Sequence, residues 1–341
     1  MKTAPAKGLV SIVVASYNHA GFLQRRMDSL LAQTYANTEI LGIEDCSPDS
    51  SLEVLRGYEA HPKVRLIVRE QNGGWVTVSN QGVDLASGEY VLFANCDDEC
   101  EPRMIERLVQ AMEVWPSAGI VYCRSQMIDS QSRVRSDDFV VREKAFRDRC
   151  ARDTLLSGAE ATRFLLHSCV IPNLSAALFR RECFDRVGYL SSSYRVCSDW
   201  DLFFRVAAEY DMGYIAEPLN RFRQHETTIR SATKDRVVYD EYFRLLLRQA
   251  AHPGLSEWLK TRTRLRVMYL WAVHLTDRRG GGLLNFPHHL RAVLAEDGWA
   301  LVMFFPSLLV RASECLIKLT FRILTDGVHL KRKLHGGFSI A

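Results

Sequence analysis

The chain has 341 residues, of which 47% are hydrophobic and 25% are charged. These proportions are typical of a globular protein with a substantial core, built as one large domain or as one domain with a tail. Lysine and arginine number 44 against 40 aspartate and glutamate residues, which gives a formal net charge of +4. This balance argues against nucleic-acid binding, so we expect no nucleic acid among the partners.

The nine cysteines are scattered, and no two of them form a C-x-x-C pair. This pattern favours reduced thiols in the cytoplasm over a disulfide framework or a zinc knuckle. The apolar run at residues 9–15 is short, has no small-residue cleavage pattern and leads directly into polar residues. We therefore do not interpret it as a signal peptide, and we expect a cytoplasmic protein.

From residue 9 onward, apolar runs alternate with segments of helical period, the pattern of an α/β fold with a mainly parallel sheet flanked by helices. Apolar residues recur at helical spacing between the first two predicted strands, and another helix is predicted over residues 74–86. Further helices are expected to begin at Ser47-Pro48, with the serine as cap, and at Pro102. The predicted strands are residues 9–16, 39–44, 64–68, 90–94 and 120–123.

The second half of the chain is less regular. Residues 133–153 carry many charges of both signs and few apolar side chains, which predicts an exposed, mobile excursion. Residues 239–274 are predicted to be mostly helical, with a break at 252–254. We expect a catalytic domain over residues 1–230, a helical extension over residues 231–297 and an amphipathic basic tail over residues 298–341.

The tail begins with apolar residues between Trp299 and Phe305 and ends in a basic stretch at residues 331–333. Its longest apolar run, residues 298–310, is about half of the roughly 20 residues that a spanning helix needs, so we expect no transmembrane helix. Two interpretations stay open. The tail is either a helix packed on the catalytic core or an amphipathic anchor in peripheral contact with anionic lipid at the inner face of the cell membrane.

Polar residues follow four of the predicted strands, where the ligands of parallel sheets bind. A nucleotide-sugar donor needs an acceptor for its base, close backbone approach and a cation for its diphosphate. Asp45 could accept from a base N–H, Tyr17 could contact the base face, and Gly73-Gly74 would let the backbone approach the ligand. The polar segments are Ser16-Tyr17-Asn18, Glu44-Asp45, Asn72-Gly73-Gly74 and Asn95-Cys96-Asp97-Asp98.

The adjacent carboxylates of Asp97 and Asp98 repel each other unless a cation or hydrogen-bond donors compensate. Mg²⁺ and Mn²⁺ take oxygen ligands and keep coordination positions for substrate phosphates, so this pair predicts a metal site, with helix capping as the alternative. His225 could complete that site or contact the diphosphate. Arg221 and Arg223, on either side of Phe222, could neutralise phosphate if both point at the donor.

Asp199 and Asp201 begin a segment of helical period that is apolar on several sides. Acidic residues in the first turn of a helix are favoured by its dipole, so one of the two has a capping role available. The other could act as general base on an acceptor hydroxyl, an effect worth about 10²- to 10⁴-fold in rate.

In this order and spacing, these residues resemble those of the family 2 glycosyltransferases, which have the GT-A fold. The resemblance covers about residues 8–228. It rests on the segments Val10–Asn18, Glu44–Asp49, Asn72–Gly74, Gly88–Asp98 and Ser198–Leu202 and on His225.

The resemblance implies an inverting, single-displacement transfer in which Asp199 is the catalytic base. It also implies that Ala15, Tyr17 and Asp45 bind the nucleotide and that Asp97 and Asp98 form a D-x-D-like metal motif. With the candidates from the strand ends, the expected donor contacts are Ala15, Tyr17, Asn18, Asp45, Gly73 and Asp97, and the expected metal ligands are Asp98 and His225.

Three positions depart from the family pattern. Asn95 stands where many members have the first aspartate of a longer acidic run, and Glu44 replaces the first of a frequent aspartate pair. Ser198 replaces the usual glutamate before the catalytic aspartate, which leaves Asp201 as an alternative base. The chain has no Q-x-x-R-W motif. Together with the expected absence of transmembrane helices, this argues against a processive polysaccharide synthase.

The sequence thus predicts a glycosyltransferase that uses Mg²⁺ or Mn²⁺ to move one sugar from a nucleotide-sugar, with UDP-sugar as the first expectation. The acceptor would be a hydroxyl of a glycan or a lipid-linked molecule in surface polysaccharide biosynthesis. One alternative is a non-catalytic sugar-nucleotide or glycan-binding protein of the same fold. Another is a nucleotidyltransferase, although we find no glycine-rich triphosphate loop near the N-terminus.

Overall fold

The computed structural model describes residues 5–226, 228–276 and 282–314, and the chain divides into two compact units, residues 1–233 and 234–341. The first unit is built on a mixed sheet of ten strands among the described residues. The strands are β1 (Ala6–Ser16), β2 (Thr38–Glu44), β3 (Val64–Val68), β4 (Gly88–Phe93), β5 (Glu99–Cys100), β6 (Ala118–Ile128), β7 (Val134–Asp137), β8 (Thr154–Leu156), β9 (Ala177–Arg180) and β10 (Asp211–Arg223).

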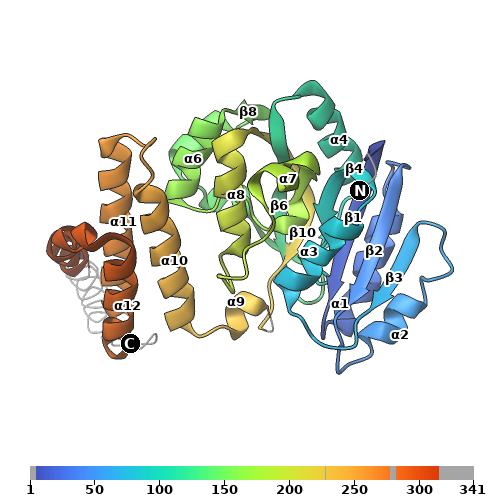
Figure 1. The fold of residues 1–341 in the computed structure, drawn as a ribbon, viewed down its shortest axis with the longest axis horizontal. Helices are drawn as coiled ribbons and strands as arrows, with labels where there is room; N and C mark the ends of the chain where they lie inside the picture. The colour runs from blue at the N-terminus through green and yellow to red at the C-terminus, as the bar shows by residue number, and fades with distance from the viewer. Residues whose placement is uncertain (1–4, 227, 277–281, 315–341) are drawn as a thin grey trace, which may run out of the picture. The chain divides into compact units, whose positions relative to one another are not determined.

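The strand order is β3-β2-β1-β4-β9-β6-β10-β5, with β7 paired to β6 and β8 paired to β10. The neighbours β3, β2, β1 and β4 are labelled in Figure 1. The longest ladders, β1 with β2 and β10 with β6, are parallel, which confirms the predicted mainly parallel sheet. Strand β9 runs antiparallel between β4 and β6 and joins the two parallel halves. The centre of β1 is buried on both faces, which explains its continuous apolar run from Ile12 to Val14.

Helices lie between the strands of the first unit and cover the sheet (Figure 1). In the first helix, Leu23, Met27 and Leu30 are buried at helical spacing and join the core under the sheet. The helices are α1 (Ala20–Leu31), α2 (Ser51–Arg56), α3 (Trp75–Leu85), α4 (Met104–Val114), α5 (Lys144–Arg149), α6 (Gly158–His167), α7 (Glu182–Val187), α8 (Ser198–Glu209) and α9 (Ile229–Ala232).

Two expectations about the first unit are wrong. Helix α2 begins at Ser51 rather than at Ser47, because residues 45–47 form a turn that continues from β2. The charged stretch 133–153 is not a mobile excursion, because it contains β7 and α5. Its helix buries Phe146, whose ring packs edge-on against Phe164 at 5.3 Å. Ion pairs neutralise many of the charges in this stretch. A high content of charged residues was therefore not sufficient evidence for a mobile segment.

The second unit is a packed group of helices, α10 (Asp235–Ala250), α11 (Glu257–Thr276) and α12 (Gly282–Asp297), followed by a 3₁₀ turn, η3 (Gly298–Met303). Trp271 is fully buried at its centre, and its ring lies 4.5 Å from that of Phe304. The ring of His289 is buried as well, and its Nδ1 forms a hydrogen bond with the carboxylate of Asp240 at 2.5 Å. The predicted helical extension with a break after α10 is therefore present.

The last described helical segment, Leu284–Glu314, is 31 residues long. By length and composition alone it could cross a membrane, and only 22% of its most apolar 18-residue stretch is buried. The apolar run at residues 298–310, which we expected to be too short to span, lies within this segment, where α12 ends at Asp297 and the 3₁₀ turn follows. Length and composition alone do not distinguish a spanning helix from one that lies along a surface. Residues 315–341 of the predicted tail lie outside the described part of the chain.

Candidate active site

The turns that follow β1 and β2 are tied together. Ser16 pairs with Glu44 in the parallel register, so both strands end at the same level. The buried Glu44 carboxylate accepts hydrogen bonds from the backbone N–H groups of Cys46 and Ser47, at 3.0 and 2.8 Å. The Ser47 hydroxyl accepts one from the backbone N–H of Asn18, at 3.1 Å. The glutamate that departs from the family pattern therefore shapes the turn.

Positive φ angles occur at two residues of these turns, Asn18 at 54° and Cys46 at 59°. Non-glycine residues adopt this region uncommonly, and such backbone is concentrated at functional sites. The ring of Tyr17 stands 44% exposed beside Asn18, and Ala15 is half-buried at the end of β1. Three of the predicted donor contacts, Ala15, Tyr17 and Asn18, thus line one end of the sheet.

Asp45 is buried and organises the glycine loop that follows β3. Its two carboxylate oxygens accept hydrogen bonds from the backbone N–H groups of Gly73 and Gly74, at 2.8 and 2.9 Å. The Arg69 guanidinium lies 2.9 Å from the same carboxylate. Gly74 has φ 79° and ψ 157°, a conformation that requires glycine, and it caps α3. A carboxylate offers about four acceptor sites, and the two backbone hydrogen bonds use two of them.

Asp97 lies beyond the end of β4, where it meets a histidine from the other half of the sheet. Its Oδ2 is 2.9 Å from Nε2 of His225, which follows β10. Burial opposes ionisation of Asp97, but the hydrogen bond with His225 and the proximity of His19 outweigh it, so the pKa of Asp97 lies below its usual range. The ligand atoms of His19, Asp97 and His225 all lie within 4.8 Å of one another, so the group fits a divalent cation.

Asp98 is buried, and its carboxylate is occupied by protein groups. The amide of Asn173 and the hydroxyl of Ser175 each donate to its Oδ2 at 2.6 Å, and the backbone N–H of Arg223 donates to its Oδ1 at 2.9 Å. Burial and the neighbouring carboxylate of Asp97 raise the pKa of Asp98 to about 7. The structure thus places Asp98 outside the group of three residues that fits a cation.

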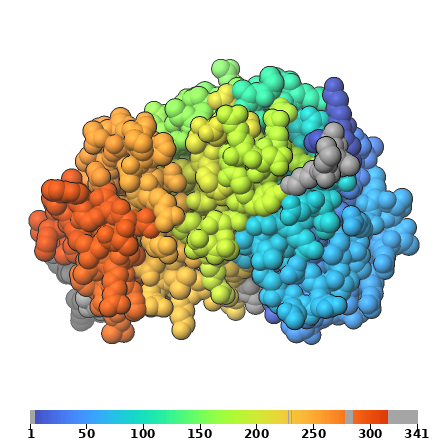
Figure 2. All heavy atoms as spheres, viewed as in Figure 1, coloured from blue at the N-terminus to red at the C-terminus, as the bar shows by residue number. Residues whose placement is uncertain are grey.

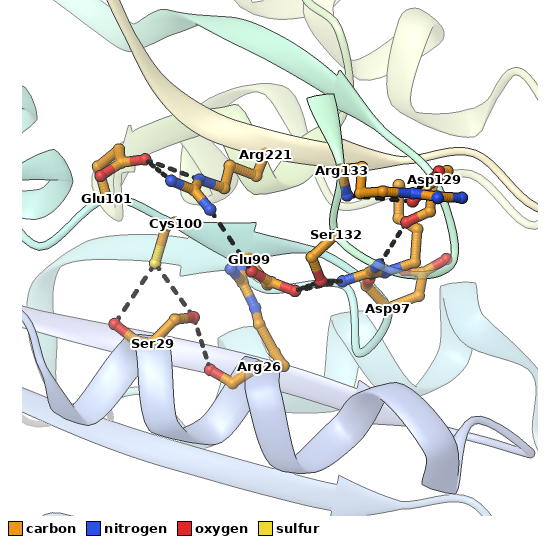
Figure 3. A network of polar contacts seen from close by, with 11 residues as sticks. Arg26, Ser29, Asp97, Glu99, Cys100, Glu101, Asp129, Ser132, Arg133 and Arg221 are labelled. Carbon is orange, nitrogen blue, oxygen red and sulfur yellow. Dashed lines mark hydrogen bonds and ion pairs between the residues drawn. The ribbon is translucent and has the colours of Figure 1, made fainter. Parts of the chain in front are cut away.

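Arg223 is fully buried and joins the acidic turn to the loop between β6 and β7. Asp97 of the turn and Asp129 of the loop are labelled in Figure 3. The Arg223 guanidinium donates to the backbone carbonyls of Asp97 and Asp129, both at 2.6 Å, and forms an ion pair with Glu99. Arg221 is held by Glu101 at 2.6 Å. Phosphate neutralisation by both arginines required both to point at the donor, and Arg223 is instead committed to protein groups, among them the half-buried carboxylate of Glu99 on β5.

The two acidic residues of α8 have different surroundings. Asp201 is buried and forms an ion pair with Arg205 at 2.9 Å, one turn along the helix. The same guanidinium donates to the backbone carbonyl of Tyr189 at 2.8 Å, which fixes the side chain. Asp199 is half-buried in the first turn and accepts a hydrogen bond from the backbone N–H of Trp200 at 2.7 Å.

Contacts on both sides of the loop that precedes α8 attach it to α3, which begins at the glycine loop. The indole N–H of Trp75 donates to the carbonyl of Arg195 at 3.1 Å, and the amide of Asn80 donates to the carbonyl of Leu190 at 2.9 Å. The Ser198 hydroxyl donates to the carbonyl of Ser191 at 2.8 Å. Ser198, which replaces the glutamate usual at this position in the family, therefore anchors the start of α8.

Sequence reasoning did not identify every residue of this site. Missed residues include Arg69, which holds Asp45, and His19, which joins Asp97 and His225. His19 directly follows the polar segment after the first strand, so its place in the sequence was a usable signal. The sequence around Arg69 did not indicate its contact with Asp45, because the two residues meet only through the pairing of β2 with β3.

The sequence matches the family model described as Glycosyl transferase family 2 over residues 11–188, just over half of the chain. The chain therefore belongs to the family 2 glycosyltransferases and is a transferase. An uncharacterised glycosyltransferase of Rickettsia typhi is 28% identical over 231 residues, which cover 66% of this chain and 67% of that protein. The match to an uncharacterised protein of Sinorhizobium fredii covers 13% of that protein, and the match to an uncharacterised glycosyltransferase of Rickettsia prowazekii covers 60% of that protein.

Solved structures show the same arrangement of strands and helices. The TarS fragment of residues 1–349 from S. aureus, in complex with UDP-GlcNAc, gives a TM-score of 0.66 at 14% identity over 88% of this chain and 89% of that one. A mannosyltransferase of Pyrobaculum calidifontis, in complex with GDP-Man and Mn²⁺, gives 0.53 at 17% identity over 93% and 83% of the two chains. The fold of this protein is therefore of the GT-A type.

Proposed function

We propose that this protein is a metal-dependent, inverting, non-processive glycosyltransferase that moves one sugar from a nucleotide-sugar to an acceptor hydroxyl in surface glycan biosynthesis. One observation carries the proposal. The Asp45 loop and the Asp97–His225 pair lie beyond strand ends of one sheet, where an α/β sheet binds its ligand, and the loop that precedes α8 is tied to the start of α3 beside the Asp45 loop.

The donor would bind at the turns after β1 and β2. The free acceptor capacity of Asp45, the exposed ring of Tyr17 and the backbone of Ala15, Asn18 and Gly73 suit a nucleoside. The neighbours of this fold were solved with UDP-GlcNAc and GDP-Man, and we take a UDP-sugar as the first donor to test. A cation held by Asp97 and His225 would neutralise charge on the diphosphate. Asp98 would position this turn rather than bind the cation, in contrast to the role expected from the family motif.

Asp199 would act as the general base. Its carboxylate takes the proton of the acceptor hydroxyl while that oxygen bonds to the anomeric carbon. The bond from that carbon to the diphosphate oxygen breaks, and the nucleoside diphosphate leaves with the electron pair. The half-buried position of Asp199 supports this role, because the neighbouring Asp201 is committed to Arg205.

A donor screen that measures nucleoside diphosphate release tests the proposal. We expect turnover of one nucleotide-sugar with Mn²⁺ or Mg²⁺ and an acceptor, and loss of turnover after chelation. Binding of a nucleotide-sugar without any release would indicate a non-catalytic binding protein. Release of pyrophosphate from a nucleoside triphosphate would indicate a nucleotidyltransferase, and either result would contradict the proposal.

We also propose that the second unit contacts the cytosolic face of a membrane, where a lipid-linked acceptor would be presented. Phe304 packs inward, whereas Trp299, Val302, Phe305 and Leu309 recur on the outer side of the helix and are 62% to 75% exposed. The segment forms part of the surface of its unit (Figure 2). In the sequence from residue 311 onward, six basic residues stand against two acidic ones, which suits anionic lipid.

Co-sedimentation with anionic vesicles tests this contact. We expect the full chain to pellet with vesicles that contain phosphatidylserine, and the paired change Val302→Glu and Phe305→Glu to reduce the bound fraction. The paired change Val140→Glu and Val141→Glu, which adds the same two charges at exposed valines of the first unit, serves as the control and should bind like the wild type. If the variant with Val302→Glu and Phe305→Glu binds vesicles as well as the wild type does, this face is not the membrane contact. Concentration-dependent self-association in its place would assign the face to a second copy of the chain.

A further inference from the structure

The ring of His19 is held in one orientation and one tautomer. Its Nδ1 lies 2.7 Å from the backbone carbonyl oxygen of Tyr17. A carbonyl only accepts hydrogen bonds, so Nδ1 must carry the proton and donate it. In the neutral imidazole this leaves a lone pair on Nε2, the arrangement found in histidines that bind metals.

That Nε2 atom is buried and has no hydrogen-bond partner among the described residues. A buried polar atom without a partner costs about 1–3 kcal/mol, so an unmet acceptor here calls for an explanation. The nearby carboxylate of Asp97 makes no hydrogen bond with this atom, and an ionised carboxylate cannot donate to its lone pair. A cation satisfies both the Nε2 lone pair and the carboxylate.

The neighbours of His19 support a defined site. Its ring centroid lies 5.4 Å from that of His225, with an angle of 74° between the planes, and the ring of Phe22 packs against both. Its backbone N–H donates to the hydroxyl of Ser51 at 3.3 Å, at the point where α1 begins. The imidazole is therefore positioned by packing and by the backbone rather than by its own flexible side chain.

We infer that His19 is the third protein ligand of the cation, through Nε2, beside Asp97 and His225. The inference rests on the proposed function and deepens it, because two imidazoles and one carboxylate would select among cations. Imidazole nitrogen suits the first-row transition metals, whereas Mg²⁺ is bound through oxygen in near-ideal octahedral geometry. The site therefore favours Mn²⁺ over Mg²⁺, and Co²⁺ over Mn²⁺.

Electron paramagnetic resonance of Mn²⁺ tests the ligand set directly, without donor turnover. Titration of metal-free protein with Mn²⁺ gives the dissociation constant from the signal of the free ion, and pulsed measurements detect the ¹⁴N coupling of each bound imidazole. The wild type should show two imidazoles and His19→Gln one, with the Mn²⁺ dissociation constant raised by about tenfold or more. His252→Gln, in a loop of the second unit, should match the wild type.

Two further measurements keep the inference falsifiable if His19→Gln folds poorly. Co²⁺ should displace Mn²⁺ from the wild type at lower concentration than Mg²⁺ does. His19→Asp replaces the imidazole ligand with a carboxylate ligand. This variant should recover Mn²⁺ binding and should prefer Mn²⁺ over Mg²⁺ less strongly than the wild type does. Two imidazole couplings in folded His19→Gln, or equal displacement by Mg²⁺ and Co²⁺ in the wild type, would overturn the inference.

The outcomes separate this inference from the proposed function. If the wild type releases nucleoside diphosphate from a donor while Mn²⁺ shows a single imidazole, the glycosyltransferase assignment stands and the role of His19 fails. If two imidazoles bind Mn²⁺ but no donor is consumed, the metal site stands and the proposed reaction fails.

Discussion

The first unit has two pairs of aspartates, Asp97 with Asp98 and Asp199 with Asp201, and in both pairs the two members have different surroundings. In each pair one carboxylate is buried and occupied by protein partners. Asp98 accepts from Asn173 and from two other groups, and Asp201 is fixed by Arg205. The other member, Asp97 or Asp199, is the one to which we assign a role in cation binding or catalysis.

The surrounding elements explain this division. Side chains one or two positions apart in a turn or a first helical turn point in different directions, so the two members of each pair meet different partners. The contacts of the buried member fix the local backbone and thereby position the neighbouring aspartate. Substitution of the four residues one at a time should therefore separate losses of activity from losses of stability.

The largest effect is expected from Asp199→Asn. Loss of the general base should lower the turnover number by about 10²- to 10⁴-fold, whereas nucleotide affinity and the free energy of unfolding should stay close to the wild type. Nucleoside diphosphate release and calorimetric nucleotide binding check both parts. Glu209→Gln, at the exposed end of the same helix, is the matched control. Wild-type turnover in Asp199→Asn would move the base to another residue.

Asp98→Ala should act on stability. Three buried donors lose their acceptor, so we expect the free energy of unfolding to fall by about 3 kcal/mol. Urea unfolding measures the loss, with Asp97→Ala as the comparison, because Asp97 makes fewer contacts with buried donors. A smaller loss for Asp98→Ala than for Asp97→Ala would reverse the division that we propose for this pair.

Asp97→Asn should act on the cation. Removal of the carboxylate should raise the Mn²⁺ dissociation constant by about 10- to 100-fold, or about 1.4–2.7 kcal/mol. The concentration of Mn²⁺ that gives half-maximal turnover should rise in parallel, while urea unfolding of the metal-free protein should change little. Unchanged metal dependence in this variant would favour Asp98 as the ligand, as the family motif implies.

The smallest effect is expected from Asp201→Asn. The ion pair with Arg205 is partly exposed, with 29% of the arginine and 11% of the aspartate side chain accessible, so its loss should cost about 0.5–1 kcal/mol of unfolding free energy. Turnover should stay near the wild type. Thermal unfolding and the donor assay test this together. Turnover as low as that of Asp199→Asn would show that the two carboxylates share the base role.

Most of the parallel half of the sheet could be predicted from the sequence. Central strands are covered on both faces, so their runs are continuously apolar, and Val64–Val68 was predicted with its observed bounds. The antiparallel strand β9 was not predicted, because its four residues show neither clear alternation nor flanking turn signals. The charged stretch at 133–153 was misread because few apolar anchors, such as Phe146, are enough to order it.

The sequence by itself determined which residues stand at the carboxyl ends of the strands, because strand ends and apolar periodicity are local properties of a chain. It therefore identified Tyr17, Asp45, the acidic turn and α8 as parts of one predicted site. Only the tertiary structure decided which acid of each pair is buried, Asp98 and Asp201. It also brought His19 beside His225, because partners distant in the chain meet only through sheet pairing and buried packing.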